Sequence, residues 1–407
     1  MKKDHPIPVI LSFLAMILMV LLFSLVSSRI WREKPEGMPE EKIIHIQKNM
    51  SVREFGEKNH LPPQVLKKLF GVSSTGEMEK RISEFGLSLD KIRSRAGGYM
   101  ILASEKTSRN WFKIRFKFVL WVLFLALAFV LMLRGAVTPG RRKWLYLVSA
   151  GLFGVILGSD PGPMGTVKDG IALFGSHRVI FTPRLVAMGV LLFLGVVANK
   201  FVCSWACQLG VLQDFIFRLN RNRKDTRGII RQFKIPFSVT NNIRVFFFLV
   251  FAFVSFVWAF DLVEPVDPFK IYKPAMIGTV GGIFLAILLV SSLFVYRPWC
   301  HFFCPFGLVS WLLEKISLFR IKVNYDTCIS CEACSRACPS NVMKTILKRD
   351  DIIPDCFACG TCIRVCPTQS IRFAPGPRKK PPEGKFKKRE GKTNQAAIQM
   401  ESGMDQI

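Results

Sequence analysis

The sequence predicts an all-α polytopic membrane protein that ends in a small α+β domain. Two properties support the membrane part: half of the 407 residues are hydrophobic, and the mean hydropathy is +0.30. Soluble globular domains are less apolar and lack long uninterrupted apolar segments. A third property supports the separate C-terminal domain, because a cysteine-rich motif occurs twice beyond residue 320.

Six apolar segments are candidates for membrane-spanning helices, which need about 20 residues to cross a bilayer. They cover residues 7–26, 116–133, 144–158, 185–202, 243–263 and 275–296, and the third is the shortest. We expect about six transmembrane helices in a multi-pass protein, five of them within a domain of residues 114–316.

The first apolar segment follows Lys2 and Lys3, as in a signal peptide. Its apolar core is longer than that of most signal peptides, and the "VSSR" after it is a poor cleavage site. We expect residues 1–28 to remain as a membrane anchor. Residues 29–113 then lie outside the cytoplasm with or without cleavage.

Residues 45–95 predict two similar helical hairpins, "MSVREFGEKNHLPPQVLKKLFG" and "EMEKRISEFGLSLDKIRSRAG". Ser51 and Ser88 are the expected N-caps, since a serine hydroxyl can accept from a free N–H of the first turn. A helix-turn-helix of this kind can bind DNA, but DNA is absent outside the membrane. We expect residues 29–113 to dock a redox partner protein instead.

Lysine and arginine favour cytoplasmic loops and set the orientation of the helices. Residues 134–143 hold four basic residues and residues 218–234 hold seven, whereas the loops 159–182 and 264–274 hold two each. The first pair of loops is therefore expected inside and the second pair outside. All twelve cysteines then lie inside or at inner helix ends, where the reducing cytoplasm preserves free thiolates.

Two C-x3-C pairs follow the fourth and sixth apolar segments, in "FVCSWACQLGVLQDF" and "PWCHFFCPFGLVSWL". Each pair has an Asp-Pro in the preceding outside loop, so an internal two-helix repeat is expected. Cysteines at i and i+4 share one helical face. The four could form a third metal or cluster site, since thiolates bind iron–sulfur clusters and copper, or could serve as small buried residues. They are Cys203, Cys207, Cys300 and Cys304.

The C-terminal motifs "CISCEACSRACP" (328–339) and "CFACGTCIRVCP" (356–367) share the pattern C-x2-C-x2-C-x3-C-P. In this pattern three thiolates bind one [4Fe–4S] cluster and the fourth binds the partner cluster. Structural zinc and disulfides do not require this run twice. We predict a 2[4Fe–4S] bacterial-ferredoxin-like α+β domain at residues 317–375. Its expected ligand sets are Cys328, Cys331, Cys334 and Cys366 for cluster 1, and Cys338, Cys356, Cys359 and Cys362 for cluster 2.

Residues 376–407 form a basic, Pro- and Gly-interrupted tail that is expected to be disordered. Close to an anionic leaflet, each lysine or arginine adds about 1 kcal/mol of attraction. This tail contributes to the net charge of +28, and we expect the positive charge to bind a lipid membrane and not nucleic acid.

The sequence has no CxxCH motif, no histidine within the apolar segments and no nucleotide-binding loop, so electrons must come from another protein or a quinol.

Residues 116–373 contain, in this order, two C-x3-C helix ends and two C-x2-C-x2-C-x3-C-P motifs. This ordered set resembles that of the polyferredoxin-type membrane proteins of the NapH group, the C-terminal region of NosR and the FixG-type proteins. Gln208 stands where the family usually has proline. The resemblance implies a bacterial inner-membrane protein that transfers electrons between the quinone pool and a redox partner, as a quinol dehydrogenase-like subunit. A FixG-like copper reductase or assembly factor for a respiratory complex is the alternative, and a redox sensor is a third option.

A quinol site needs a proton acceptor beside an apolar cleft. Ionisable residues at the outer helix ends are candidates, although Asp at such positions more often forms turns. An inner site with His301 as proton acceptor competes with them, because the clusters lie at that end. The outer candidates are Asp160, Lys168, Asp169 and His177 in one loop, and Asp261, Glu264, Asp267 and Lys270 in the other.

Overall fold

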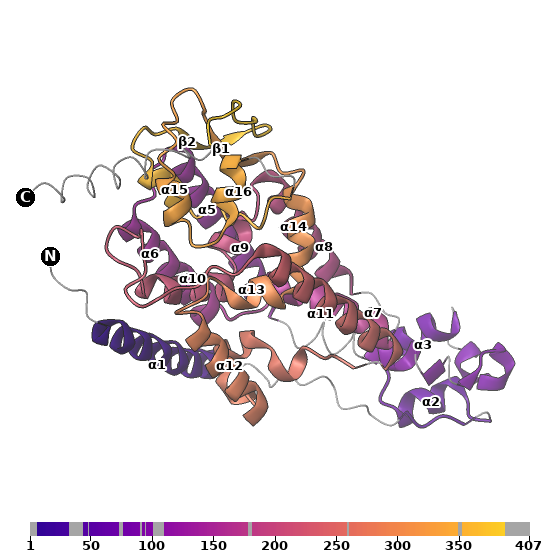
Figure 1. Ribbon diagram of the computed structural model, residues 1–407. Coiled ribbons are helices and arrows are strands. Elements are labelled where there is room, and N and C mark those ends of the chain that lie inside the picture. The colour runs from indigo at the N-terminus through magenta and orange to yellow at the C-terminus, as the bar shows by residue number, and fades with distance from the viewer. Residues whose placement is uncertain are drawn as a thin grey trace, which may run out of the picture.

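The computed structural model describes residues 6–31, 44–47, 49–72, 76–89, 92–93, 95–100, 110–177, 181–258, 260–348 and 352–386. Helices dominate these residues, and a single two-stranded sheet lies in the described C-terminal part. Helices α15 and α16 and strands β1 and β2 lie together at one end of the helical body (Figure 1).

The first helix, α1 (Ile7–Ile30), matches the predicted anchor and lies against the helical body. Its Val9, Phe13 and Val20 are buried in one apolar cluster with residues of α10 and α12. Its opposite side is exposed, with Leu11 62% exposed. Such a helix, apolar all round but buried on one side, is suited to a position between protein and lipid.

Helix α5 (Trp111–Leu133) begins at Asn110, whose side chain accepts a hydrogen bond from the Lys113 N–H. The predicted segment 144–158 forms the end of α6 (Pro139–Ser149) and a π-helical turn, η3 (Ala150–Ile156). A π-turn leaves carbonyls without their usual partners. The Ile156 carbonyl accepts from Trp31 Nε1 at 2.7 Å, so α1 stabilises the irregular end of this segment.

Helix α7 (Pro163–His177) occupies most of the segment expected as an outside loop, residues 159–182. The segment is too polar to be recognised as an apolar span, yet it folds as a helix, and its expected position outside the cytoplasm stays a prediction. It lies against α8 (Thr182–Val197), α11 (Phe237–Val257) and α14 (Pro305–Glu314). Gly175 permits the contact, since a Cβ there would lie 2.5 Å from the Ser255 carbonyl oxygen of α11.

The two C-x3-C segments have the same succession of local structures. In each, an apolar helix is interrupted, a helix of five residues follows, and the second cysteine of the pair is the N-cap of a longer helix. The first segment comprises α8, α9 (Phe201–Trp205) and α10 (Gln208–Leu219). The second comprises α12 (Thr279–Ser291), α13 (Pro298–Phe302) and α14. Between α11 and α12 lie three short 3₁₀ turns, η4 (Glu264–Val266), η5 (Pro268–Tyr272) and η6 (Pro274–Met276).

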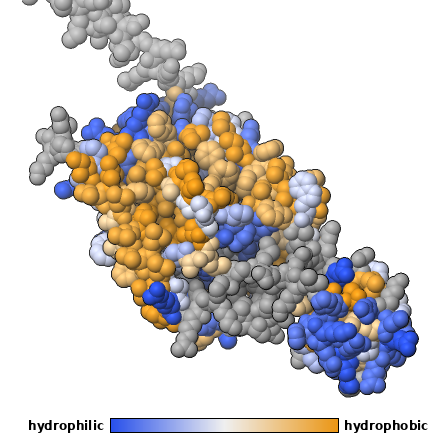
Figure 2. Space-filling model, turned by 90° about the horizontal axis from the view of Figure 1, so that it is seen from below, coloured by the Kyte–Doolittle hydropathy of each residue, from blue (hydrophilic) through white to orange (hydrophobic). Residues whose placement is uncertain are grey.

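Three of the described helices are long and apolar enough to cross a membrane: α1, α5 and α11. Helices α8 and α12 are apolar but shorter, and the prediction of about six spans is not confirmed. Large apolar areas nonetheless cover the helical body (Figure 2). These surfaces and the three long helices indicate a membrane protein.

The N-terminal unit has its own apolar core, formed by residues such as Val52, Phe55 and Ile82, and its surface is mostly hydrophilic (Figure 2). The first predicted hairpin is present as α2 (Val52–Lys58) and α3 (Pro63–Phe70), and Ser51 caps α2 by accepting from the Glu54 N–H. The second hairpin differs, because its first helix is replaced by two 3₁₀ turns, η1 (Gly76–Glu79) and η2 (Ile82–Phe85).

The C-terminal domain pairs β1 (Phe319–Val323) with β2 (Ile371–Pro375) in an antiparallel register, with Ile321 opposite Phe373. Between the strands lie α15 (Ala333–Ala337), α16 (Val342–Lys348) and α17 (Thr361–Val365). The start of the predicted disordered tail packs on this domain: Phe386 contacts the Tyr325 ring, and Arg378 Nε donates to the Ile321 carbonyl. The first residues of the tail thus contact the C-terminal domain, and residues 387–407 lie outside the described residues, so disorder of the tail stays a prediction.

Replacing Gly175 by alanine should destabilise the protein, because the new methyl group would push α7 away from α11. The expected loss is about 1–3 kcal/mol, typical of overpacking. Thermal unfolding in detergent, followed by circular dichroism, measures it. Gly170→Ala in the same helix is the control, since a Cβ there meets nothing within 4 Å. Equal melting temperatures for both variants would contradict the close α7–α11 contact.

Candidate iron–sulfur sites

The two cysteine motifs have the same unusual backbone. Ser330 and Glu332 in the first loop and Ala358 and Gly360 in the second have positive φ angles, at matching positions after the first cysteine. Three of the four are not glycine, and such strain persists at functional sites where the surroundings enforce it. Loops that alternate right- and left-handed residues turn successive N–H groups inward, which suits an anionic iron–sulfur cluster.

The structure brings the four cysteines assigned to cluster 1 close together across the two motifs. Burial raises the pKa of the Cys334 thiol to about 12, and the nearby thiolates of Cys366, Cys328 and Cys331 contribute to that rise. Cys334 belongs to α15 and Cys366 ends α17, and these two helices lie side by side. The packing of these two short helices therefore places Cys366, the fourth cysteine of the second motif, near the first three cysteines of the first motif. Cys331 is exposed at the surface.

The four cysteines assigned to cluster 2 line one hollow beside the helical body. No cysteine of the first set lines it. Tyr296, Phe357 and Met343 contribute aromatic and apolar walls. A hollow with four thiols and apolar walls has the donor set of a cubane cluster. The four are Cys338, Cys356, Cys359 and Cys362.

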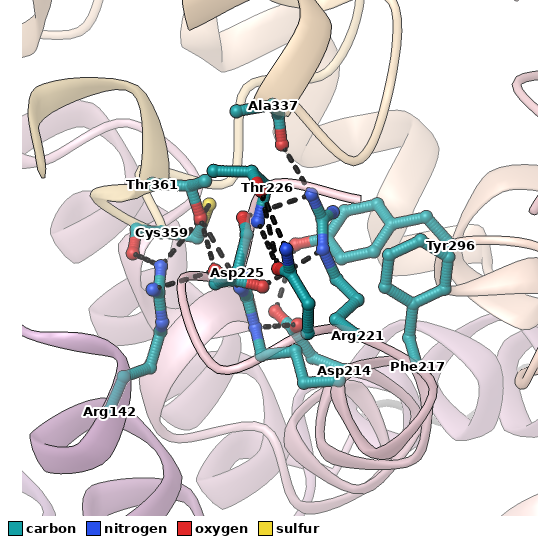
Figure 3. Close-up of polar contacts among 12 residues, drawn as sticks. Arg142, Asp214, Phe217, Arg221, Asp225, Thr226, Tyr296, Ala337, Cys359 and Thr361 are labelled. Atoms are coloured by element: carbon teal, nitrogen blue, oxygen red, sulfur yellow. Dashed lines mark hydrogen bonds and ion pairs between the residues drawn. The ribbon is translucent and has the colours of Figure 1, made fainter. Parts of the chain in front are cut away.

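A buried ionic network lies next to this hollow, and Figure 3 shows its contacts around Asp225. Arg142 of α6 donates to the Cys359 carbonyl at 2.7 Å and to Asp225 at 2.8 Å. Arg221 donates to the Ala337 carbonyl at 2.7 Å, next to Cys338. Asp225 thus holds arginines that reach the backbone of both cysteine motifs. Arg218 joins the same carboxylate and also binds Asp214.

The network contains more positive than negative charge. Four guanidinium groups face two carboxylates, all at most 5% exposed: Arg142, Arg218, Arg221 and Arg297, with Asp214 and Asp225. Buried charge without compensation is costly. Arg142 Nε and Arg218 Nη2 also have no hydrogen-bond partner. An anionic thiolate-bound cluster in the adjacent hollow would supply the missing negative charge, so these residues fit such a group.

The C-x3-C cysteines are also gathered in one place, at the interrupted ends of α9 and α13. Burial raises the pKa of Cys304, and the thiolates of Cys300, Cys207 and Cys203 raise it further. Gly307 donates its N–H to Cys304 Sγ at 3.3 Å. All four thiols are buried, at 6–8% exposure.

Glycines three residues after the second cysteine of each pair make these turns possible. A Cβ on Gly210 would lie 2.6 Å from the Cys203 carbonyl oxygen, and a Cβ on Gly307 would lie 2.9 Å from the Cys300 carbonyl oxygen. Near these thiols, Gln213 Oε1 lies 3.8 Å from Cys300 Sγ, while its buried Nε2 has no partner. A polar donor without a partner marks this site as more than apolar packing.

Within the described residues, no three or more His, Cys, Asp or Glu side chains are spaced closely enough to hold a single metal ion.

The C-x3-C helix ends contact the second cysteine motif directly. Asn199 Nδ2 donates to the Cys356 carbonyl at 2.7 Å, and Trp205 Nε1 donates to the Ala358 carbonyl at 3.4 Å. Lys200 of the same break forms a buried ion pair with Asp355. Sequence reasoning missed these residues, because their partners lie more than 150 positions away along the chain.

His301, the predicted inner proton acceptor, is buried against the rings of Tyr296 and Phe357, which also contact each other. Its Nδ1 lies 3.6 Å from Asp355. Burial lowers the pKa of His301 to about 4, although Asp355 opposes this effect. Asp355 also binds Lys200 and Arg244, and against the opposing effect of burial these two cations hold the pKa of Asp355 at about 2.

The outer candidates form a second ionic cluster. Lys168 lies 2.8–3.5 Å from Asp169, Asp261, Glu264 and Asp267, so it joins the two predicted outside loops. Asp160 pairs with Lys273 at 2.6 Å. Burial raises the pKa of Asp267 to about 6, against the opposing charge of Lys168. Lys270 binds Glu264. His177 ends α7, and its side chain lies outside the described residues.

Comparison with protein families supports the cysteine assignments at the level of domains. A model described as a 4Fe-4S binding domain matches residues 180–226 and 277–324, which contain the two C-x3-C pairs. A model described as a 4Fe-4S dicluster domain matches residues 320–367. The chain therefore carries 4Fe-4S-type domains both in its helical body and at its C-terminus.

Among curated proteins, the chain is similar to YccM of Escherichia coli K12, with 26% identity over 41% of this chain and 49% of YccM. It is 26% identical to the methylamine utilization ferredoxin-type protein MauN of Methylorubrum extorquens, over 49% of this chain and 68% of MauN. It is 31% identical to the ferredoxin-type protein NapH of Haemophilus influenzae, over 40% of this chain and 56% of NapH.

These matches span about half to two thirds of the length of each relative. No solved structure matches the chain significantly. The relatives include the regulatory protein NosR of Pseudomonas aeruginosa, 26% identical over 19% of its length. The resemblance to NapH- and NosR-type polyferredoxins, inferred from the motifs, is confirmed.

Asp225→Asn should weaken binding of cluster 2, because three buried arginines would lose their shared carboxylate. Breaking a buried ion pair typically costs about 3–5 kcal/mol. Iron content after anaerobic purification should fall from about eight per chain toward about four, the content of one cubane. The exposed Asp326→Asn in the same domain is the control. Unchanged iron content in Asp225→Asn would show that the network does not support the cluster.

Proposed function

We propose that this chain is a membrane-bound electron-transfer protein that passes electrons between the quinone pool and a redox partner. The observation that carries this proposal is the direct contact between the C-x3-C helix ends and the second cysteine motif. Asn199 binds the carbonyl of Cys356, and Trp205 binds that of Ala358. A cluster site thus lies at the boundary between the apolar helices and the C-terminal domain.

When bound, the clusters supply one-electron transfer. The chain's own residues would set an order among the sites. The C-x3-C group is buried at the helix ends, the site of cluster 2 lies beside it in the hollow next to the arginine network, and the ligands of cluster 1 reach the surface at Cys331. The excess of buried arginine charge favours extra negative charge on cluster 2. Cluster 1 is the point of exchange with a soluble redox partner.

The membrane placement follows the distribution of basic residues. We propose a multi-pass protein of the bacterial inner membrane, with the C-terminal domain in the cytoplasm and residues 29–113 outside it. The described part of that N-terminal segment has a separate core and a hydrophilic surface (Figure 2), which suits docking of a redox partner. The two C-x3-C segments, with matching local structures, would form an internal repeat.

The C-x3-C group distinguishes the two candidate functions. As a third cluster it would extend the electron path into the helical body. As a copper site it would make the chain a metal reductase or assembly factor, with the clusters as reductant. Four gathered thiols favour either use, and the 4Fe-4S binding domain model that matches the residues around both C-x3-C pairs favours the cluster. We therefore propose electron transfer first and copper handling as the alternative.

Iron content separates these possibilities. Anaerobically purified protein should contain about eight irons per chain from the ferredoxin motifs, and about twelve if the C-x3-C group holds a cubane. Replacing Cys203, Cys207, Cys300 and Cys304 by serine should lower a count of twelve to eight. Ser204→Ala, next to Cys203, is the control. An iron content that is the same with and without these four thiols would exclude a third cluster.

The proposed orientation is tested with reporter fusions. A reporter that is active only outside the cytoplasm should be silent when fused after Ile407 and active when fused after Gly97. The physical reason is the retention of lysine- and arginine-rich loops on the cytoplasmic side. A cytoplasm-active reporter at both positions provides the reciprocal control. The reverse pattern would overturn both the orientation and the cytoplasmic placement of the clusters.

A further inference from the structure

A polar residue stands six positions after the second cysteine of each C-x3-C pair. It is Gln213 in the first segment and Ser310 in the second. Gln213 lies on α10 and Ser310 on α14, the two helices that the second cysteines cap. Both side chains are buried, with Gln213 0% and Ser310 5% exposed. The two segments therefore place a buried polar group at the same position relative to their cysteines.

Each of these polar groups contacts the first cysteine of the opposite pair. Gln213 Oε1 lies 3.8 Å from Cys300 Sγ, and Ser310 Oγ lies 4.0 Å from Cys203 Sγ. The contacts are crossed, because the helix of one segment serves the cysteine of the other. The same contact in both directions indicates that it serves the group of four thiols as a whole.

The amide of Gln213 is suited to a cysteine that has become a thiolate. Its Oε1 faces the Cys300 thiol, while its buried Nε2 has no hydrogen-bond partner. A thiol can donate to Oε1, but a metal-bound thiolate has lost its proton and can only accept. A half-turn of the amide exchanges its oxygen and nitrogen. With a thiolate at Cys300, that half-turn gives the unpartnered donor a partner.

The hydroxyl of Ser310 can make the same change. In the structure it donates to the Gly307 carbonyl at 3.2 Å. That carbonyl also accepts from Lys200 Nζ at 2.7 Å and from Arg244 Nη1 at 3.4 Å. It therefore keeps two donors when the hydroxyl hydrogen rotates away. Ser310 is thus free to donate to a thiolate at Cys203.

Hydrogen bonds to the sulfur ligands of an iron–sulfur cluster change its reduction potential. A donor stabilises negative charge on the sulfur, and the reduced cluster carries more of that charge than the oxidised one. Two such donors therefore favour the reduced form. The family model described as a 4Fe-4S binding domain includes both segments, and with them Gln213 and Ser310.

We propose that Gln213 and Ser310 form a crossed pair of hydrogen-bond donors, to Cys300 and Cys203, that raises the reduction potential of an iron–sulfur cluster held by the C-x3-C cysteines. The two are positioning residues, because they act through the sulfur atoms and are not ligands. This inference rests on the proposed electron-transfer function, in which these cysteines bind a third cluster. It adds which side chains set how readily that site accepts an electron.

The experiment is a redox titration of the full-length protein, purified anaerobically in detergent and followed by electron paramagnetic resonance. Dithionite supplies the electrons. The relevant signal is the one that disappears when all four C-x3-C cysteines are replaced by serine. Gln213→Met and Ser310→Ala each remove one donor. At the midpoint potential of the unmodified protein, each should lower the ratio of reduced to oxidised cluster at least about threefold, the effect of one hydrogen bond.

Two matched controls remove a buried polar group that bonds to a backbone carbonyl. Gln208→Met lies on α10 like Gln213, and the Gln208 amide donates to a carbonyl of the π-helical turn at 3.2 Å. Ser292→Ala removes a fully buried hydroxyl that donates to a carbonyl of α12 at 2.8 Å. Both should leave the ratio unchanged. Ser310→Thr keeps the hydroxyl and should keep the ratio of the unmodified protein.

Several results would overturn the proposal. They are an unchanged ratio in Gln213→Met and Ser310→Ala, an equal fall in the controls, and the absence of any signal that depends on the four thiols. A purely structural role would lower the iron content and leave the midpoint of the remaining cluster unchanged, which would also overturn it. If Gln213→Met failed to fold, the comparison of Ser310→Ala with Ser310→Thr would decide.

A second measurement separates this inference from the proposed function. The oxidised protein is mixed with duroquinol, which gives two electrons and releases two protons to water as it becomes the quinone. Reduction of the clusters by duroquinol, with an unshifted ratio in the variants, would overturn the donor pair and retain quinol-linked electron transfer. A shifted ratio without reduction by duroquinol would support the donor pair and contradict the proposed function.

Discussion

The burial of excess arginine charge against the cysteine loops is the constraint on which the structure depends. Asp214 accepts from Arg218, Arg297 and the hydroxyls of two tyrosines, and Asp225 accepts from Arg142 and Arg218. These side chains come from α6, α10, the loop after α10 and the residues just before α13, and through Arg142 and Arg221 they reach the C-terminal domain. One ionic network therefore joins the helical body to both cysteine motifs.

This arrangement couples the folding of the body to the occupation of the cluster sites. Without an anionic cluster, the arginines near Cys359 keep unpartnered nitrogen atoms and an uncompensated charge. With a cluster, the same charge stabilises the thiolates and the additional electron of the reduced state. The interrupted helices serve the same purpose, because the breaks before α9 and α13 bring Asn199, Lys200 and Arg297 to the domain boundary.

The structure also contains two polar centres within a largely apolar body. One surrounds the C-x3-C group and Asp355, next to the cluster domain. The other is the ion-pair cluster of Lys168, which joins the segments preceding α8 and α12. The second has a sufficient structural explanation, since every one of its acidic groups faces a lysine or arginine. The centre around the C-x3-C group contains polar atoms without hydrogen-bond partners, so it is the better candidate for redox chemistry.

The sequence alone determined the features that depend on local spacing. Four cysteines at fixed intervals specify a cluster loop wherever it lies, and apolar runs specified α1, α5 and α11. It could not determine α7, whose mixed composition becomes helical through packing on α11 and α14. Nor could it identify the network around Asp225 or the contact of Asn199 with the second cysteine motif. Arg142 and the Cys359 carbonyl are separated by 217 positions, and only tertiary folding brings such groups within hydrogen-bonding distance.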